Sequence, residues 1–224
     1  MLFLLISTFV CSGLFFLNII LFFYFILVLN FGYSGACAMD CPQRQYKQFE
    51  VYKQAMNSHP HIVVIEFGTN DILYNNYDEN LFITDYLSLI NGFKNLASKP
   101  TIYINIPNPY YLNISESYNK NNPNYKSVLT AFNKANIQLP IVIKKIALLT
   151  NSIIIDLFNL LGGINLLKPD TMHPDLLHPR DLGYNSIAHE IAFNIAKHEN
   201  FEFINHKHEH NSDIRSRNRD KMIK

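Results

Sequence analysis

Two residues near the C-terminal end of the sequence, Asp175 and His178, have the types and spacing needed for acid–base chemistry. Two residues separate them and Pro179 follows, so both side chains belong to one tight loop. A carboxylate in such a loop can hold one nitrogen of the imidazole ring, and the other nitrogen then acts as a general base on a nucleophile. The pair therefore predicts the base of a hydrolase site together with the group that orients it.

Two other residues have the chemistry to stabilise a developing negative charge. Asn70 follows an apolar run rich in β-branched residues, Ile62–Phe67, which ends abruptly at Gly68-Thr69-Asn70-Asp71. A side-chain amide at the end of a buried strand is suited to donate a hydrogen bond to an oxyanion. Gly35 lies in a turn of small residues and can donate its backbone N–H to the same oxygen, because no side chain blocks a close approach.

Each of these residues also has a simpler explanation when it is taken alone. Asn70 can cap the turn after a strand, Asp175 can cap a helix or turn, His178 can be a surface histidine, and Gly35 can be an ordinary turn glycine. The functional interpretation therefore depends on their occurring together and in order along the chain.

The elements expected to position these residues alternate short apolar runs with longer amphipathic stretches, which is typical of repeated βαβ units. Strands are predicted at 26–29, 62–67, 101–106 and 152–156, and helices at about 43–56, 81–96, 127–137, 140–149 and 182–198. This pattern predicts an α/β fold, a three-layer α/β/α sandwich on a parallel sheet, with the site at the C-terminal ends of the strands.

Three segments of the chain resemble the conserved blocks of the SGNH hydrolases, also called GDSL-type esterases. The segments are Gly32-Tyr33-Ser34-Gly35-Ala36, Gly68-Thr69-Asn70-Asp71 and Asp175-Leu176-Leu177-His178-Pro179, similar to the second, third and fifth blocks. The resemblance implies a flavodoxin-like fold, Gly35 and Asn70 as the oxyanion hole, and Asp175 and His178 as two members of a Ser-His-Asp triad.

Two further segments, Pro107-Asn108-Pro109-Tyr110 and Ile155-Asp156-Leu157, are similar to the branch of sialate O-acetylesterases and acetylxylan esterases. This similarity implies a small-molecule or carbohydrate ester as the substrate. It implies no organic cofactor and no metal.

The family's first block, Gly-Asp-Ser with the serine nucleophile, is missing before Asn30. The serines upstream are Ser7 and Ser12, and neither has the flanking Gly-Asp; Ser7 is retained as the candidate nucleophile. A fold without its normal first strand and nucleophile loop is therefore expected. A triad hydrolase without its serine keeps only about 10³–10⁴-fold acceleration over water. The expectation is an impaired or inactive ester hydrolase, and the alternative is a membrane-anchored, non-catalytic protein that binds esters or sugars.

The first 29 residues carry no charge, and the first charged residue of the chain is Asp40. This apolar run exceeds the roughly 20 residues that cross a bilayer, so it is expected to be a membrane anchor or a faulty gene-model start. An anchor would place the protein at a membrane or in the secretory pathway. Residues 30–200 are expected to form the hydrolase domain, and the charged segment 201–224 is expected to be a disordered tail.

Composition excludes two other classes of site. The net charge is +1 and the basic residues do not gather on one predicted face, so no nucleic-acid partner is expected. The 3 cysteines, Cys11, Cys37 and Cys41, all lie near the N-terminus. Their odd number and their spacing predict neither a disulfide framework nor a zinc site.

Overall fold

The structure is a computed structural model that describes residues 2–7, 27–74, 77–111, 125–164, 169–175 and 177–200. The chain divides into two units, Met1–Asn194 and Ile195–Lys224, and the second is described only as far as Asn200. The expected tail, 201–224, lies outside the described residues, as do residues 8–26 of the expected anchor.

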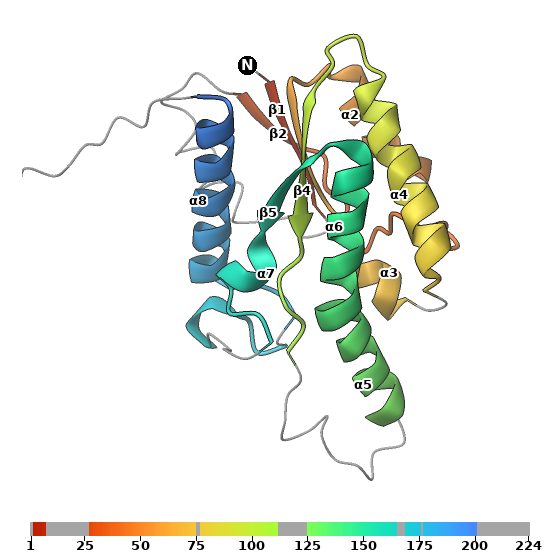
Figure 1. The fold of residues 1–224 in the computed structure, drawn as a ribbon, viewed down its shortest axis with the longest axis vertical. Helices are drawn as coiled ribbons and strands as arrows, with labels where there is room; N and C mark the ends of the chain where they lie inside the picture. The colour runs from red at the N-terminus through yellow and green to blue at the C-terminus, as the bar shows by residue number, and fades with distance from the viewer. Residues whose placement is uncertain are drawn as a thin grey trace, which may run out of the picture. The chain divides into compact units, whose positions relative to one another are not determined.

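Five parallel strands form one sheet, in the order β2-β1-β3-β4-β5 (Figure 1). The strands are β1 (Leu2–Ser7), β2 (Leu27–Asn30), β3 (Ile62–Glu66), β4 (Thr101–Ile106) and β5 (Ile153–Asp156). All residues of β3 are buried, which explains its continuous apolar sequence, since a parallel strand is covered on both faces. The predicted α/β fold on a parallel sheet is confirmed.

The first strand corrects the expectation that it would be missing. Leu2–Ser7 forms β1 between β2 and β3, with Leu2 opposite Leu27 and Ser7 opposite Glu66. An apolar strand buried on both faces has the same composition as part of a membrane-spanning run, so sequence periodicity could not separate the two. Across the described part of the chain, no helix is both long and apolar enough to span a membrane.

Helices cover both faces of this sheet. Figure 1 shows α4 (Glu79–Lys94) and α6 (Leu139–Thr150) on one side, and the part of α8 (Asp181–His198) up to Asn194 on the other. The start of α4 is set by Asp78, whose side chain accepts a hydrogen bond of 2.8 Å from the Leu81 N–H. α6 has Pro140 in its first turn and ends at Asn151 in the left-handed conformation, with φ 47°.

One cluster of buried side chains lies between the sheet and the helices of the α4 and α6 side. Its largest fully buried side chains are aromatic, and they include Tyr86 and Phe93 of α4 together with Phe67 at the end of β3. The other helices among the described residues are α2 (Glu50–Asn57), α3 (Thr69–Leu73), α5 (Tyr125–Asn133) and α7 (Leu157–Leu160). Helix α5 continues through a π-helical segment into α6, and short 3₁₀ turns occupy Tyr46–Gln48 and Pro169–Thr171. Of these, α3 bears directly on the site, because it begins immediately after Gly68 and contains Asn70.

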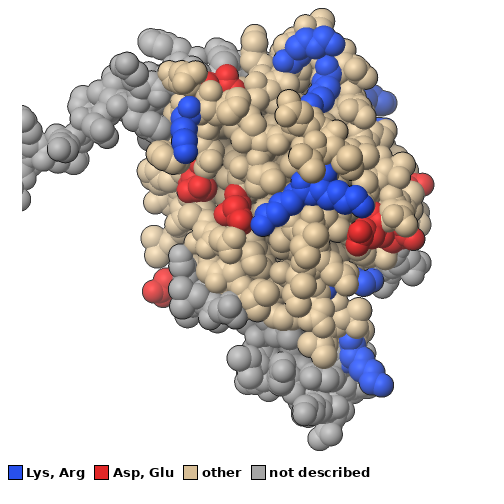
Figure 2. Space-filling view, in the orientation of Figure 1, with Lys and Arg blue, Asp and Glu red and all other residues tan. Residues whose placement is uncertain are grey.

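Charged side chains are spread over the surface that Figure 2 shows, with Lys and Arg interspersed among Asp and Glu. The net charge of +1 agrees with this mixture. That face therefore carries no continuous basic surface of the kind that binds nucleic acid.

Candidate active site

Asp175 and His178 are hydrogen-bonded to each other within one loop. Nδ1 of His178 lies 2.7 Å from Oδ2 of Asp175, and Oδ1 of Asp175 accepts hydrogen bonds from the backbone N–H groups of Leu177 (3.0 Å) and His178 (2.9 Å). Because a carboxylate only accepts, Nδ1 is the donor, and Nε2 is the basic nitrogen of the neutral ring. The loop thus places a general base whose tautomer is set by Asp175.

The environment of Asp175 keeps its carboxyl ionised. Partial burial alone would raise the pKa of this group. The hydrogen bonds from the backbone of His178 and Leu177 and from the His178 side chain, together with the charge of His178, outweigh that effect and lower the pKa to about 2. At neutral pH the carboxylate is therefore charged, as needed to orient and stabilise an imidazolium.

A second histidine lies beside the same carboxylate. Nδ1 of His173 is 3.3 Å from Oδ2 of Asp175, and the His173 backbone N–H donates to the carbonyl oxygen of His178 at 2.7 Å. His173 was not among the residues predicted for the site, although this histidine lies only two residues before Asp175.

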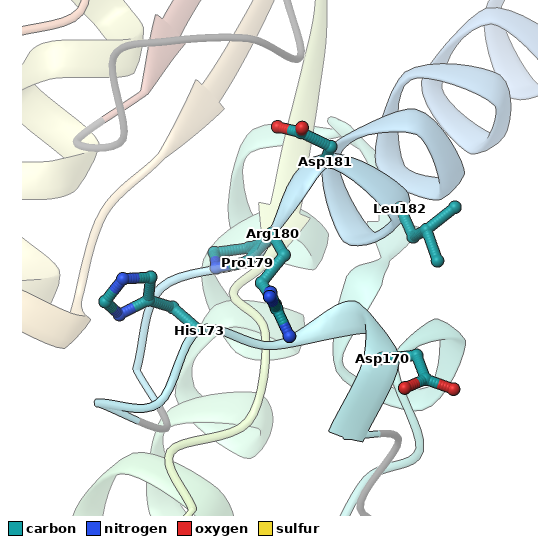
Figure 3. Close-up of a pocket in the computed structure, with 6 residues that line it drawn as sticks. All are labelled: Asp170, His173, Pro179, Arg180, Asp181 and Leu182. Carbon is teal, nitrogen blue, oxygen red and sulfur yellow. The ribbon is translucent and has the colours of Figure 1, made fainter.

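A polar hollow opens on this loop. It has a volume of about 510 Å³ and is lined by Asp170, His173, Pro179, Arg180, Asp181 and Leu182. Figure 3 shows Arg180 projecting between His173 and Asp170. The hollow offers both hydrogen-bond donors and acceptors, which suits a ligand that carries hydroxyl groups.

Asn70 is hydrogen-bonded to Ala36, the residue that follows Gly35. Gly35, in the turn after β2, has a φ of +76°, a conformation that favours glycine. Asn70, in the first turn of α3, is buried, and its Nδ2 donates to the carbonyl oxygen of Ala36 at 3.2 Å. An amide nitrogen has two hydrogens, so one holds the turn and the second can serve a ligand. Two donors suited to an oxyanion therefore lie on neighbouring segments.

Asn108 attaches the loop of Asp175 and His178 to the sheet. It follows β4, it is buried, and its Nδ2 donates to the carbonyl oxygen of Leu177 at 2.9 Å. The segments after β2, β3 and β4 thus all contribute at the C-terminal edge of the sheet, as the fold class predicts. Sequence reasoning noted Pro107-Asn108-Pro109-Tyr110 as a family-like segment but did not assign Asn108 to the site.

The topology also places the candidate nucleophile. Ser7 is the last residue of β1, and β1 lies between β2 and β3, the strands that lead to Gly35 and Asn70. Ser7 therefore ends a strand that lies between the two strands leading to Gly35 and Asn70. Ser12, the other upstream serine, lies outside the described residues.

A buried acid, Glu66, ends β3 opposite Ser7. Its Oε2 accepts a hydrogen bond of 2.8 Å from Nδ2 of Asn105 on β4. Burial raises the pKa of Glu66 to about 7, although the bond from Asn105 acts in the opposite direction. Ionising this group in the folded protein is therefore unfavourable.

We expect Glu66→Gln to flatten the dependence of stability on pH. The folded-state pKa is raised, so ionisation of Glu66 costs stability as pH rises from about 4.5 to about 7, by roughly 3 kcal/mol in total. The variant should come closest to the wild type near pH 4, where Glu66 is largely protonated in both the folded and the unfolded state, and should have the larger free energy of unfolding at pH 8, measured by urea denaturation.

The ionisation of two other groups also makes the stability of the protein depend on pH. Burial also raises the pKa of Asp71 to about 7, so some slope should remain in the variant. The pKa of Asp175 is lowered to about 2, so its contribution is lost only as the pH falls below about 4. Equal slopes for wild type and variant between pH 5 and pH 8 would contradict the assignment.

Three buried residues below the Gly35 turn have metal-ligand chemistry. The ligand atoms of Cys37, Cys41 and Asp71 lie within 4.8 Å of one another, and Oδ1 of Asp71 accepts a 2.7 Å bond from the Met39 N–H. Burial, reinforced by Asp71, raises the pKa of Cys37, and burial raises that of Cys41, so both thiols are protonated at neutral pH. Binding of a metal at these residues would release the thiol protons. The hydrogen bond from Met39 shows how Asp71 holds the loop that follows Gly35.

Comparison with known proteins places these residues in a context. A family model described as the GDSL-like lipase/acylhydrolase family matches residues 23–185, well over half of the chain. No curated protein sequence matches.

Solved structures with a similar fold include three with related descriptions. A GDSL-like lipase from Bacteroides thetaiotaomicron has a TM-score of 0.63 at 18% identity, covering 88% of each chain. A catalytic mutant of an acetylxylan esterase from Geobacillus stearothermophilus has a TM-score of 0.62 at 20% identity, covering 87% of this chain and 93% of that one. The acetyl xylan esterase AlAXEase has a TM-score of 0.58 at 15% identity, covering 87% and 100%.

Proposed function

Because the chain belongs to the GDSL-like lipase/acylhydrolase family, we propose that it hydrolyses carboxylic esters, with acetyl groups on carbohydrates as the substrate class. The observation that carries the proposal is the 2.7 Å bond between His178 and Asp175, made by a carboxylate that two backbone N–H groups hold in place. This arrangement supplies an oriented base, and Gly35 and Asn70 lie on the same sheet edge.

In the proposed reaction, Nε2 of His178 takes the proton from a serine hydroxyl as its oxygen attacks the ester carbonyl. The resulting oxyanion accepts hydrogen bonds from Nδ2 of Asn70 and the N–H of Gly35. Collapse of this intermediate expels the alcohol, to which the imidazolium returns the proton. Water, activated by the same base, then releases the acid and regenerates the serine.

We propose Ser7 as the nucleophile. The support is topological: β1 ends at Ser7 between the two strands whose following turns carry Gly35 and Asn70. The expectation of an impaired enzyme rested on the missing Gly-Asp-Ser motif, and Ser7 lacks those flanking residues. A serine at the C-terminal end of a central parallel strand has the placement that α/β enzymes use for their chemistry.

Two observations favour a carbohydrate ester. Two of the similar structures are named as acetylxylan esterases. The hollow beside Asp175 is lined by Asp170, Arg180 and Asp181, whose side chains can hydrogen-bond the hydroxyl groups of a sugar. The alternative, a membrane-anchored binding protein, gains no support from the described residues.

A fluorophosphonate probe tests the nucleophile directly. We expect the purified chain to be labelled once, with the adduct located on Ser7 by peptide mass spectrometry. Ser7→Ala should abolish both labelling and hydrolysis of p-nitrophenyl acetate, whereas the matched control Ser12→Ala should leave both unchanged. Labelling at Ser12 would reject only the assignment of Ser7 as the nucleophile. The absence of labelling at any serine would reject serine-based hydrolysis and favour a non-catalytic binding protein.

A further inference from the structure

A guanidinium group covers the turn that contains Gly35. A Cβ built on Gly35 would lie 2.9 Å from Nη1 of Arg44 and 3.8 Å from the hydroxyl of Tyr74. The guanidinium carbon of Arg44 lies 3.9 Å from the centroid of the Tyr74 ring. Arg44 and Tyr74 thus meet directly beside the glycine proposed as an oxyanion donor.

The backbone holds both residues in this position. Arg44 donates its N–H to the carbonyl oxygen of Cys41 and accepts a hydrogen bond from the Cys37 N–H, each at 2.9 Å. Tyr74 ends α3, and its N–H bonds to the carbonyl oxygen of Asn70 at 2.9 Å. Arg44 therefore belongs to the loop that follows Gly35, and Tyr74 to the helix that contains Asn70. Their contact joins the same two segments as the bond between Asn70 and Ala36.

The charge of Arg44 remains available to a ligand. Arg44 is exposed, and none of the ion pairs formed within the described part of the chain includes it. Stacking on an aromatic ring restrains a guanidinium but leaves the N–H groups at its edge able to bind an anion. Hydrogen bonds from a charged donor to an anionic oxygen are about twice as strong as neutral ones.

We propose that Arg44 is a third oxyanion donor, which binds the anionic oxygen of the tetrahedral intermediate beside Gly35, and that Tyr74 positions it. The inference rests on the proposed ester hydrolysis. It deepens that proposal by adding a full positive charge to a hole otherwise built from two neutral donors, Gly35 and Asn70. A positive charge that is held in place where negative charge develops stabilises the transition state more than it stabilises the bound substrate.

The experiment measures anion binding and catalysis separately. Methylphosphonate, a tetrahedral anion that carries one methyl group like the acetyl intermediate, is titrated into wild type, Arg44→Gln, Arg44→Lys and Tyr74→Leu at fixed ionic strength, by calorimetry. The matched control is Lys53→Gln, which removes an exposed positive charge from α2, where Lys53 pairs with Glu50. Circular dichroism checks that each variant is folded, and the conservative variant Tyr74→Phe keeps the ring.

We expect Arg44→Gln to weaken methylphosphonate binding at least about 10-fold and to lower kcat for p-nitrophenyl acetate by a similar factor with little change in KM. Arg44→Lys should recover part of both effects, Tyr74→Leu should resemble Arg44→Gln, and Tyr74→Phe and Lys53→Gln should resemble the wild type. Failure of the wild type to bind methylphosphonate, or equal binding by Arg44→Gln, overturns the inference.

The two proposals fail in different ways. Binding that depends on Arg44 in a chain that neither reacts with fluorophosphonate nor cleaves esters would reject the proposed hydrolysis and keep the anion site. Ester hydrolysis that is unaffected by Arg44→Gln would keep the proposed function and reject the role of Arg44.

Discussion

His178→Ala should reduce kcat for p-nitrophenyl acetate by about 10⁵–10⁶-fold, because the proposed mechanism assigns proton transfer from the nucleophile to this imidazole. Nδ1 of His178 is held by Asp175 at 2.7 Å, so Nε2 alone can serve as the base. The side chain is about half exposed, so its removal should leave the fold intact, as thermal unfolding of the variant can verify.

Two companion variants make this prediction specific. Asp175→Asn keeps the shape of the side chain, but its amide NH₂ can donate to Nδ1 of His178 instead of accepting from it. Because this favours the wrong tautomer of the imidazole, kcat should fall by about 10⁴-fold. His173→Ala is the matched control, since His173 also lies beside Oδ2 of Asp175, at 3.3 Å. A loss for His173→Ala as large as for His178→Ala would show that the assignment of the base is wrong.

Asn70→Ala should lower kcat by about 10²–10³-fold with a much smaller change in KM, because an oxyanion donor acts on the transition state more than on the ester. The measurement is steady-state hydrolysis of p-nitrophenyl acetate. A loss of kcat below about 10-fold in a folded variant would contradict the role of Asn70.

A structural effect must be separated from this catalytic one, because Nδ2 of Asn70 also donates to the carbonyl oxygen of Ala36. Asn136→Ala is a matched control, since Asn136 is another buried asparagine whose Nδ2 donates to a backbone oxygen, that of Tyr110. Both variants should lose about 1–3 kcal/mol of stability by urea unfolding. Only Asn70→Ala should also lower kcat by about 10²–10³-fold.

Local features of the molecule could be predicted from sequence with good accuracy. The strands at 62–66 and 101–106 were recognised because a parallel strand covered on both faces needs an unbroken apolar run. The contact between Asp175 and His178 was also recognised, because only two residues of one turn separate them and the geometry is almost local. The helix expected at 182–198 is observed as α8.

The first strand could not be recognised in this way. All residues of Leu2–Ser7 except Ser7 are apolar, and the strand belongs to a longer uncharged segment, so its composition fits a bilayer and a sheet interior equally well. The pairing of β1 with β2 and β3 distinguishes a buried strand from a membrane-spanning segment, and this pairing exists only in the assembled sheet. With β1 in place, the region between Gly35 and Asn70 has a serine whose reactivity can be tested.

The residue types and order along the chain were therefore enough for the fold class and for the contact between Asp175 and His178. The catalytic roles of these two residues, and those of Gly35 and Asn70 as donors, stay predictions. The contact between Arg44, Tyr74 and Gly35 and the bond from Asn105 to buried Glu66 emerged only from the folded chain. The physical reason is that turns and periodic strands follow short-range rules. Contacts between distant segments depend on the order of the strands and on which loops share one edge of the sheet.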